Sequence, residues 1–429
     1  MQSAFPEGFA AEMEALLGEE SARLLAALGR RPVRGLRLNG LKPSERLWAQ
    51  CQGLRAVPWC AEGRLAPEDL RPGRSPRHAA GLYYMQEPSA MAPAGALEVL
   101  PGERVLDLCA APGGKSTQLA AAMGGRGVLV ANEIHPGRAR VLLENLERLG
   151  VENAVVLCEK PERLLQHFGA WFDAVLVDAP CSGEGLFRRE EEARRQWSPA
   201  QVEACAQRQA QILRCAAGLV RPGGRLVYST CTFNEKENEG NVEGFLREQS
   251  GFCLEGEPRR LLPHRVEGEG QFFARFRRRQ EGKGTGLQLL RHDGAERSYW
   301  EFSQRFLSLP WQGPLLRQGD WLYGVCEDMP DLRGLRVLRA GLQLGRFRPG
   351  RFEPAHALAL RARPNAFCQA VELDGERAAA YLRGLSLELE GPLQGWTVAC
   401  VDGWPLGWGK ADNGVLKNHY PKGLRMLGS

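Results

Sequence analysis

One stretch, residues 104–117, constrains the fold of this chain more than any other segment; it reads Arg-Val-Leu-Asp-Leu-Cys-Ala-Ala-Pro-Gly-Gly-Lys-Ser-Thr. An apolar run interrupted by Asp107 predicts a strand, residues 112–114 predict a tight turn, and residues 116–123 predict a helix. A strand, a glycine turn and a helix in this order form the first unit of a doubly wound sheet. The glycines let the backbone approach a ligand closely, and the helix start offers free N–H groups.

Two kinds of ligand are compatible with this turn at first sight. Gly114-Lys115-Ser116 resembles the end of a phosphate-binding loop, which requires a glycine five positions before Gly114. Cys109 stands there, and its side chain does not replace a glycine needed for close backbone approach. Asp178 could end the acidic strand of a nucleotide triphosphatase, but Pro180 follows almost directly. The sequence therefore favours the other ligand, S-adenosylmethionine, whose amino acid part the turn would hold.

Strand and helix patterns alternate regularly after this first unit. Further strands are predicted over residues 127–132, 154–157, 172–177 and 224–229, with a last, edge strand over 271–278. Helices are predicted over residues 137–149, 161–168, 199–220 and 240–249. This alternation implies an α/β fold with a doubly wound, mostly parallel Rossmann-like sheet. Glu133 follows the second strand, where an acid commonly accepts hydrogen bonds from ribose hydroxyls.

The rest of the chain divides into three further parts. Residues 1–90 form an N-terminal extension, with amphipathic helices over 9–28, a short strand over 34–39 and loops over 58–76. Residues 91–280 form the domain that contains the predicted sheet, and a glycine-rich linker over 281–286 precedes an intermediate domain at 287–365. Residues 366–429 predict a small β-rich module in which Trp and Tyr alternate with Lys. Such side chains can bind RNA or form a barrel core, and we expect Trp396 and Trp404 in the core.

Composition and charge limit the kinds of binding partner that the protein can have. No apolar run is long enough to span a membrane, so a cytoplasmic protein without a membrane partner is expected. The twelve cysteines lack paired CxxC spacing, which argues against a metal site or a disulfide framework. Net charge is only +5, but residues 30–80 hold 11 Lys and Arg against 4 Asp and Glu. This local basic excess suits phosphate contacts, although a solvated arginine-rich surface is an equally good interpretation of the region alone.

Two cysteines occupy a special place in the predicted sheet. Cys181 closes Asp178-Ala-Pro-Cys after one strand, and Cys231 closes Ser229-Thr-Cys after the next. Ligands of such sheets bind outside the carboxyl ends of the strands, so one crevice would hold a cofactor, an acid and two thiols. A thiolate that adds to carbon 6 of a cytosine makes carbon 5 nucleophilic enough to accept a methyl group. An acid near N3 can stabilise the adduct, and a second thiol can assist release. Position alone leaves open which thiol attacks.

At these motifs the chain resembles the RNA 5-methylcytosine methyltransferases, most closely the bacterial 16S ribosomal RNA enzymes of the RsmF type. The motifs are residues 107–115, 178–185 and 229–232, with further similarity at 35–39, 84–89, 406–410 and 417–423. The last two resemble a PUA-like RNA-binding module. The resemblance implies that Cys231 is the nucleophile, that Cys181 releases the product, and that Asp178 faces the base with Lys115 nearby. It implies a cofactor site made of Cys109, Ala110, Ala111, Pro112, Gly113, Gly114, Lys115, Glu133 and Asp178.

The resemblance leaves several points open. The family often has an Asp near the adenine after the third strand, where this chain has Glu159, so that contact is unassigned. The expected substrate is 16S ribosomal RNA or the small ribosomal subunit, and the expected form is a monomer. One alternative is a non-catalytic RNA-binding or ribosome-assembly protein on the same fold. Another is a DNA cytosine methyltransferase, in which Cys181 would attack and Cys231 would have no role.

Overall fold

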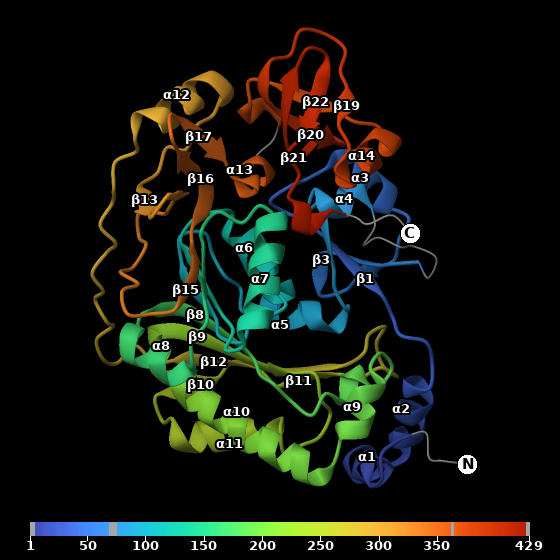
Figure 1. Cartoon of the computed structure of the whole chain (residues 1–429). Helices are drawn as coiled ribbons and strands as arrows, with labels where there is room; N and C mark the ends of the chain where they lie inside the picture. The colour runs from blue at the N-terminus through green and yellow to red at the C-terminus, as the bar shows by residue number, and fades with distance from the viewer. Residues whose placement is uncertain (1–4, 68–74, 362–363, 426–429) are drawn as a thin grey trace.

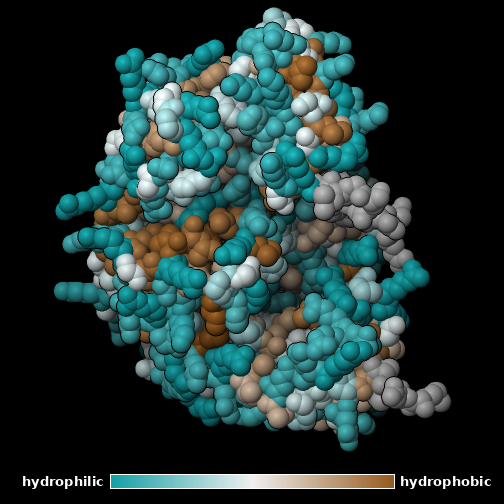
Figure 2. Space-filling view, viewed as in Figure 1, coloured by the Kyte–Doolittle hydropathy of each residue, from teal (hydrophilic) through white to brown (hydrophobic). Residues whose placement is uncertain are grey.

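The computed structural model describes residues 5–67, 75–361 and 364–425. A large central sheet lies in the middle of the molecule, with the N-terminal helices at the lower right and two C-terminal lobes at the top (Figure 1). Among the described residues no helix is long and apolar enough to cross a lipid bilayer. Figure 2 shows a mostly hydrophilic face, with hydrophobic residues gathered across the middle of the view, at the level of β15 and α7 in Figure 1.

The central sheet has nine strands. Eight run in the order β10-β12-β9-β8-β5-β6-β7-β15, and β11 pairs with β12. The strands are β5 (Arg104–Asp107), β6 (Val128–Asn132), β7 (Ala154–Leu157), β8 (Phe172–Asp178), β9 (Val220–Thr230), β10 (Phe252–Leu254), β11 (Arg259–Leu261), β12 (Gln271–Arg278) and β15 (Val337–Ala340). The strands from β9 to β7 are mutually parallel, and the flanking strands are antiparallel. The predicted α/β class with a doubly wound, mostly parallel sheet is confirmed.

The two borders of this sheet differ from the prediction. The strand β12 is not an edge, because β10 and β11 both pair with it. At the other border β15, which comes from the segment expected to form a separate intermediate domain, pairs antiparallel with β7. The three added strands, β10, β11 and β15, are short, so none gave a clear periodic signal in the sequence.

Helices cover both faces of the sheet, as strand alternation requires. On β5, Val105 packs on one face with α5, α6 and α7, and Leu106 packs on the other with α8, α10 and α11. These helices are α5 (Ala92–Ala96), α6 (Gly114–Met123), α7 (Pro136–Arg148), α8 (Pro161–Phe168), α10 (Pro199–Leu219) and α11 (Glu239–Glu248). Successive side chains of a strand point to opposite faces, so each buried strand of the sheet contributes to two cores.

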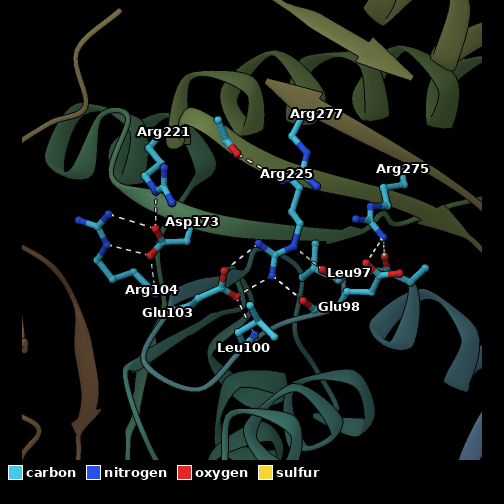
Figure 3. Close-up of polar contacts among 12 residues, drawn as sticks. Leu97, Glu98, Leu100, Glu103, Arg104, Asp173, Arg221, Arg225, Arg275 and Arg277 are labelled. Carbon is cyan, nitrogen blue, oxygen red and sulfur yellow. Dashed lines mark hydrogen bonds and ion pairs between the residues drawn. The ribbon is translucent and has the colours of Figure 1, made fainter. Parts of the chain in front are cut away.

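Ion pairs tie the strands together at their amino ends (Figure 3). Asp173 on β8 accepts hydrogen bonds from the backbone N–H of Arg104 at 2.7 Å and from its Nε at 2.9 Å, and it also pairs with Arg221. Arg225 on β9 pairs with Glu103 at 2.6 Å and donates to the carbonyl oxygen of Glu98 at 2.7 Å. The carboxylates of Asp173 and Glu103 therefore both have cationic partners.

The N-terminal part packs against the sheet domain in two places. The helices α1 (Phe9–Leu17) and α2 (Ser21–Leu28) bury Phe9 and Leu24 against Phe187 and Trp197, next to α9 (Glu191–Gln196). A second sheet has the order β2-β3-β1-β4 and is accompanied by two short helices. Its elements are β1 (Gly35–Leu38), α3 (Glu45–Cys51), β2 (Ala56–Val57), β3 (Cys60–Leu65), α4 (Pro76–Ala79) and β4 (Tyr83–Met85). The expectation of loops throughout 58–76 is wrong for β3; residues 68–74 lie outside the described residues.

The C-terminal part contains two smaller sheets. The first has the order β13-β14-β16-β17 and the second, five-stranded, has the order β18-β20-β21-β22-β19. The first includes α12 (Arg297–Phe306), β13 (Leu315–Gln318), β14 (Trp321–Gly324), β16 (Leu342–Arg348), β17 (Arg351–Pro354) and α13 (His356–Leu360). The second includes β18 (Ala370–Glu372), α14 (Gly375–Leu382), β19 (Leu387–Glu388), β20 (Gly395–Val401), β21 (Trp404–Asp412) and β22 (Val415–Asn418). Trp404 is buried as expected, whereas Trp396 is only partly buried and lines a groove.

Candidate active site

The glycine turn after β5 positions the start of α6. Gly113 has a φ of +110° as the residue before the helix, a conformation that favours glycine, and an added Cβ would lie 3.2 Å from Leu142. Ser116 in the first turn of α6 donates to Oδ2 of Asp107 at 2.6 Å. The other oxygen, Oδ1, is buried without a hydrogen-bond partner among the described residues. Burial raises the pKa of Asp107 to about 7, because water no longer solvates the carboxylate.

A cavity of about 180 Å³ opens beside this turn. Seven of the nine predicted cofactor residues line it, namely Cys109, Ala110, Ala111, Pro112, Gly114, Lys115 and Asp178. Gly113 and Glu133 do not. The prediction missed Asp107 and the run from Tyr84 to Glu87, which also line the cavity. That run begins in β4 of the N-terminal sheet, and only long-range packing brings it to the turn.

One buried arginine connects the N-terminal sheet to the turn. Arg37 on β1 is almost fully buried, and its guanidinium donates to the carbonyl oxygen of Gly114 at 2.6 Å and to Oγ1 of Thr117 at 2.7 Å. It also donates to Oε1 of Gln86, a cavity residue, at 2.5 Å. The N-terminal part therefore builds one wall of the cavity and fixes the other.

Glu133, which was expected near the ribose, and Glu159, whose contact was left unassigned, have different surroundings. Glu133 accepts from the backbone N–H of His135 at 2.9 Å and pairs with Arg138 at 3.1 Å. Arg138 also donates to the carbonyl oxygen of Ala111 at 2.9 Å, so Glu133 is joined to the turn through one arginine. Glu159 accepts from the backbone N–H of Arg336 at 2.7 Å.

Asp178 at the end of β8 is held from three sides. Lys115 Nζ lies 2.7 Å from its Oδ2, and Ser229 and Gln271 donate to its Oδ1 at 2.7 and 3.1 Å. Burial alone would lower the pKa of Lys115, but the adjacent Asp178 carboxylate outweighs it and the net shift is upward. Lys115 therefore carries its positive charge near neutral pH. Gln271 comes from β12, and no motif signalled it.

The two predicted thiols are neighbours. The sulfurs of Cys181 and Cys231 lie 3.1 Å apart, and both side chains are partly exposed. The hydrogen bond to Cys231 and burial raise the pKa of Cys181 well above its usual value, so this thiol keeps its proton. The structure thus brings Cys181, Cys231, Asp178 and Lys115 together at the carboxyl ends of β8 and β9.

Two buried glutamates hold the loops that carry the thiols. Glu184 accepts from the backbone N–H groups of Phe233 at 2.6 Å and Asn234 at 3.1 Å. Glu237 accepts from the backbone N–H of Ser182 at 3.0 Å and from Nδ2 of Asn234 at 2.8 Å. Each carboxylate of one loop therefore satisfies donors of the other. The sequence prediction missed both residues, although Glu184 lies inside the 178–185 motif.

Close backbone packing completes this connection. The backbone N–H of Gly185 donates to the carbonyl oxygen of Cys231 at 2.8 Å, and a Cβ at position 185 would lie 2.9 Å from that oxygen. Only glycine allows this approach. Among the described residues no cluster of three His, Cys, Asp or Glu side chains could hold a metal ion.

Models of four domain families match the chain. The model for 16S rRNA methyltransferase RsmB/F matches residues 94–277, and the N-terminal domain of 16S rRNA methyltransferase RsmF matches 5–88. The RsmF rRNA methyltransferase first C-terminal domain matches 301–361, and the methyltransferase RsmF PUA domain matches 368–426. The C-terminal module is therefore a PUA domain, as predicted.

Individual proteins agree with these matches. Ribosomal RNA small subunit methyltransferase F of Erwinia tasmaniensis is 35% identical over 98% of this chain and 96% of its own length. The protein of the same name in Vibrio cholerae is 32% identical over 98% of this chain and 97% of its own length. Among solved structures, a methyltransferase homolog protein from Pyrococcus horikoshii is 33% identical, with a TM-score of 0.55 over 63% of this chain and 94% of that one.

The cofactor is S-adenosylmethionine, as predicted. The cavity beside the glycine turn fits this molecule, because the unpartnered Oδ1 of buried Asp107 suits an ammonium group. The turn backbone and the run from Tyr84 to Glu87 enclose the same space. With matches along nearly its whole length, the chain belongs to the 16S rRNA methyltransferase RsmB/F family.

Proposed function

We propose that the protein methylates carbon 5 of a cytosine in 16S ribosomal RNA through a covalent cysteine–cytosine adduct. The observation that carries this proposal is the 3.1 Å contact of Cys181 and Cys231 beside the Lys115–Asp178 pair. Two thiols and an ion pair at the carboxyl ends of neighbouring strands suit addition to a pyrimidine. The names of the relatives support small-subunit ribosomal RNA as the substrate.

The chemistry requires a nucleophile, a proton site and a release step. The Cys231 thiolate adds to carbon 6, so a carbon–sulfur bond forms and carbon 5 becomes nucleophilic. Bound S-adenosylmethionine would supply the methyl group as an electrophilic sulfonium, whose sulfur–methyl bond breaks to leave a neutral thioether. Asp178, with Lys115 beside it, stabilises the base near N3 during addition. The proton on carbon 5 then passes to a base such as water, its electron pair re-forms the carbon 5–carbon 6 double bond, and the carbon–sulfur electron pair returns to Cys231.

The contact between the two sulfurs supports a division of roles between attack and release. A thiolate is the attacking form, so the sulfur that attacks gives up its proton while its neighbour can keep one. The resemblance to the RNA enzymes assigns attack to Cys231, and the position of Cys181 against it lets Cys181 exchange a proton with the departing sulfur. This assignment is opposite to that of the DNA cytosine enzymes, in which the thiol after the Asp-x-Pro motif attacks.

Trapped protein–RNA complexes test the two roles. Cys231→Ala is expected to abolish methylation and to form no covalent complex, because no adduct can begin. Cys181→Ala is expected to transfer the methyl group but to stay attached to RNA through denaturing electrophoresis. Cys253→Ala, at an exposed position on β10, serves as the control and should behave as the wild type.

The outcomes separate the alternatives. A trapped complex for Cys231→Ala and none for Cys181→Ala would reverse the roles. Absence of methylation in the wild type, with intact RNA binding, would favour a non-catalytic assembly protein. Bisulfite sequencing of 16S ribosomal RNA from a deletion strain would identify the modified cytosine.

The same proposal includes the location, form and parts of the protein. It acts in the cytoplasm as a monomer, and residues 1–90, 91–280, 287–365 and 366–429 are its four functional parts. Light scattering of the purified protein tests the monomer, and binding assays on truncated chains test the parts.

A further inference from the structure

A wide groove separates the two C-terminal lobes. It encloses about 780 Å³ between α12 and β17 on one side and the five-stranded sheet on the other. This is near the upper limit of about 1,000 Å³ for small-molecule sites, so it has room for more than one nucleotide-sized group. In Figure 1 these elements lie at the top of the molecule, and Figure 2 shows that part as mainly hydrophilic.

The sheet side of the groove carries an aromatic residue and two lysines in a row. Trp396 on β20 lies opposite Lys410 on β21, and Lys410 lies opposite Lys417 on β22. Residues directly opposite on neighbouring strands share one face of a sheet, so the three side chains stand side by side. All three line the groove. Trp396 is partly exposed and its ring contacts that of His419, with centroids 4.7 Å apart.

The facing side adds positive charge. Arg305 on α12 and Arg351 on β17 are exposed and line the groove. Its acids are already paired: Glu301 with Arg297, Glu353 with Arg346 and Arg348, and Asp412 with Lys417. Within residues 5–67, 75–361 and 364–425, the structure gives no ion pair to Lys410, Arg305 or Arg351. None of these three cations is neutralised by an ion pair in the part of the chain that the structure describes, and Arg305 lies over the ring of Phe306, 5.2 Å from its centroid.

We propose that this groove binds a single-stranded segment of the substrate RNA. A base stacks on Trp396, and phosphates contact Lys410 on one side and Arg305 or Arg351 on the other. An exposed aromatic ring among cations is the arrangement by which proteins hold unpaired strands, since stacking accepts any base and the cations hold the backbone. The inference rests on the proposed RNA substrate and adds a second contact, built jointly by both C-terminal lobes.

Binding of labelled oligouridine of about 15 nucleotides to the full-length protein tests the groove, because unpaired strands of about this length occupy such sites. Trp396→Ala should weaken binding about tenfold, within the range measured for removal of a stacked base. Lys410→Gln should reduce the slope of log affinity against log salt by about 0.7, the contribution of one phosphate contact. Affinity for S-adenosylmethionine should not change in either variant.

Matched controls exclude general effects. Trp300→Ala removes an exposed tryptophan of α12 that does not line the groove, and Lys283→Gln removes an exposed linker lysine. Both should bind oligouridine as the wild type does. Equal affinity of Trp396→Ala and wild type would overturn the groove proposal while leaving methylation untouched. Unchanged oligouridine affinity with lost binding to the small subunit would instead identify a protein-docking surface.

Discussion

Strand β8 carries an aspartate near each end, and the two residues have different roles. Asp173, near the amino end, is enclosed by Arg104 and Arg221 (Figure 3). It is not among the residues that line the cofactor cavity. Asp178, at the carboxyl end, pairs with Lys115, lines the cofactor cavity and remains 31% exposed. The same residue type on the same strand is thus fully neutralised at one end and accessible to a ligand at the other.

The difference extends to the neighbouring groups. The amino ends hold acids paired with arginines, whereas the carboxyl ends hold an unpartnered Asp107 oxygen and two thiols in contact. Groups that lack a partner cost stability, and such groups collect where a ligand can supply the partner. The ion pairs at the amino ends therefore stabilise the sheet. The unpartnered groups at the carboxyl ends lower its stability but are available to a ligand.

The largest effect is expected from Asp178→Asn. Loss of the carboxylate removes the charge that pairs with Lys115 and stabilises the base, so methyl transfer should fall by roughly 10²–10⁴-fold. The melting temperature should stay within a few degrees of the wild type. Single-turnover transfer of radioactive methyl groups, with thermal unfolding in parallel, measures both. A large drop in stability with normal activity per folded molecule would break the distinction between the two ends.

The converse effect is expected from Asp173→Ala. Two arginines and one backbone N–H lose their acceptor, and unfolding free energy should fall by about 3 kcal/mol. This is the low end of the range for breaking a buried pair, because both arginines are still partly hydrated. Denaturant titration measures it, and activity per folded molecule should be unchanged. The pKa of Asp173 is lowered, chiefly through hydrogen bonds that outweigh burial, so this stability is lost as the pH falls below about 4.

A smaller effect is expected from Glu237→Gln. The amide cannot accept from all the donors that hold the thiol loops, so turnover should fall about tenfold by misplacing Cys181 and Cys231. The KM for S-adenosylmethionine should not change, because Glu237 does not line the cavity. Glu248→Gln, which removes an exposed pair with Arg214, is the control. A loss of stability without a loss of turnover would show that the hydrogen bonds of Glu237 stabilise the fold without positioning the thiols.

The smallest effect concerns pH and the cofactor. Burial raises the pKa of Asp107 to about 7, so the free protein gains stability from this group as the pH falls from about 7 towards 4. An ammonium ligand requires the ionised form, so affinity for S-adenosylmethionine should be about tenfold weaker at pH 6 than at pH 8. Calorimetry in buffers of different ionisation enthalpy should detect proton release on binding. Asp107→Asn should bind weakly with no such dependence.

Local patterns predicted most of the sheet domain. At β5, β6 and β8 an apolar run is followed directly by its turn. Because each strand and its turn are adjacent in the sequence, a single local pattern predicts both. The order of the parallel strands then predicts that Asp178 and Cys231 lie together at one edge of the sheet. Seven of the nine residues predicted for the S-adenosylmethionine site line one cavity for the same reason, since most of that wall is a single turn.

Contacts between distant segments could not be predicted. Tyr84 and Gln86 reach the cavity only because β4 pairs with β1 and Arg37 bridges to α6. In the sequence Glu184 and Glu237 look like ordinary surface glutamates. Only the folded loops show that both are buried and accept hydrogen bonds. Trp396 was expected in the core because the apolar run of β20 is buried, but its register turns it towards the groove.

The antiparallel strand β15 has a consequence for how the chain is made. Its partner β7 has four buried apolar residues, Ala154–Leu157, and about 180 residues separate the end of β7 from the start of β15. Until β15 has been synthesised, β7 is an edge strand whose unpaired backbone groups can pair with strands of other chains. A chain cut in the linker at 281–286 would keep that edge permanently. The segment after the linker thus protects the edge strand β7 of the central sheet by pairing β15 with it. Fragments that contain the sheet domain alone should therefore aggregate.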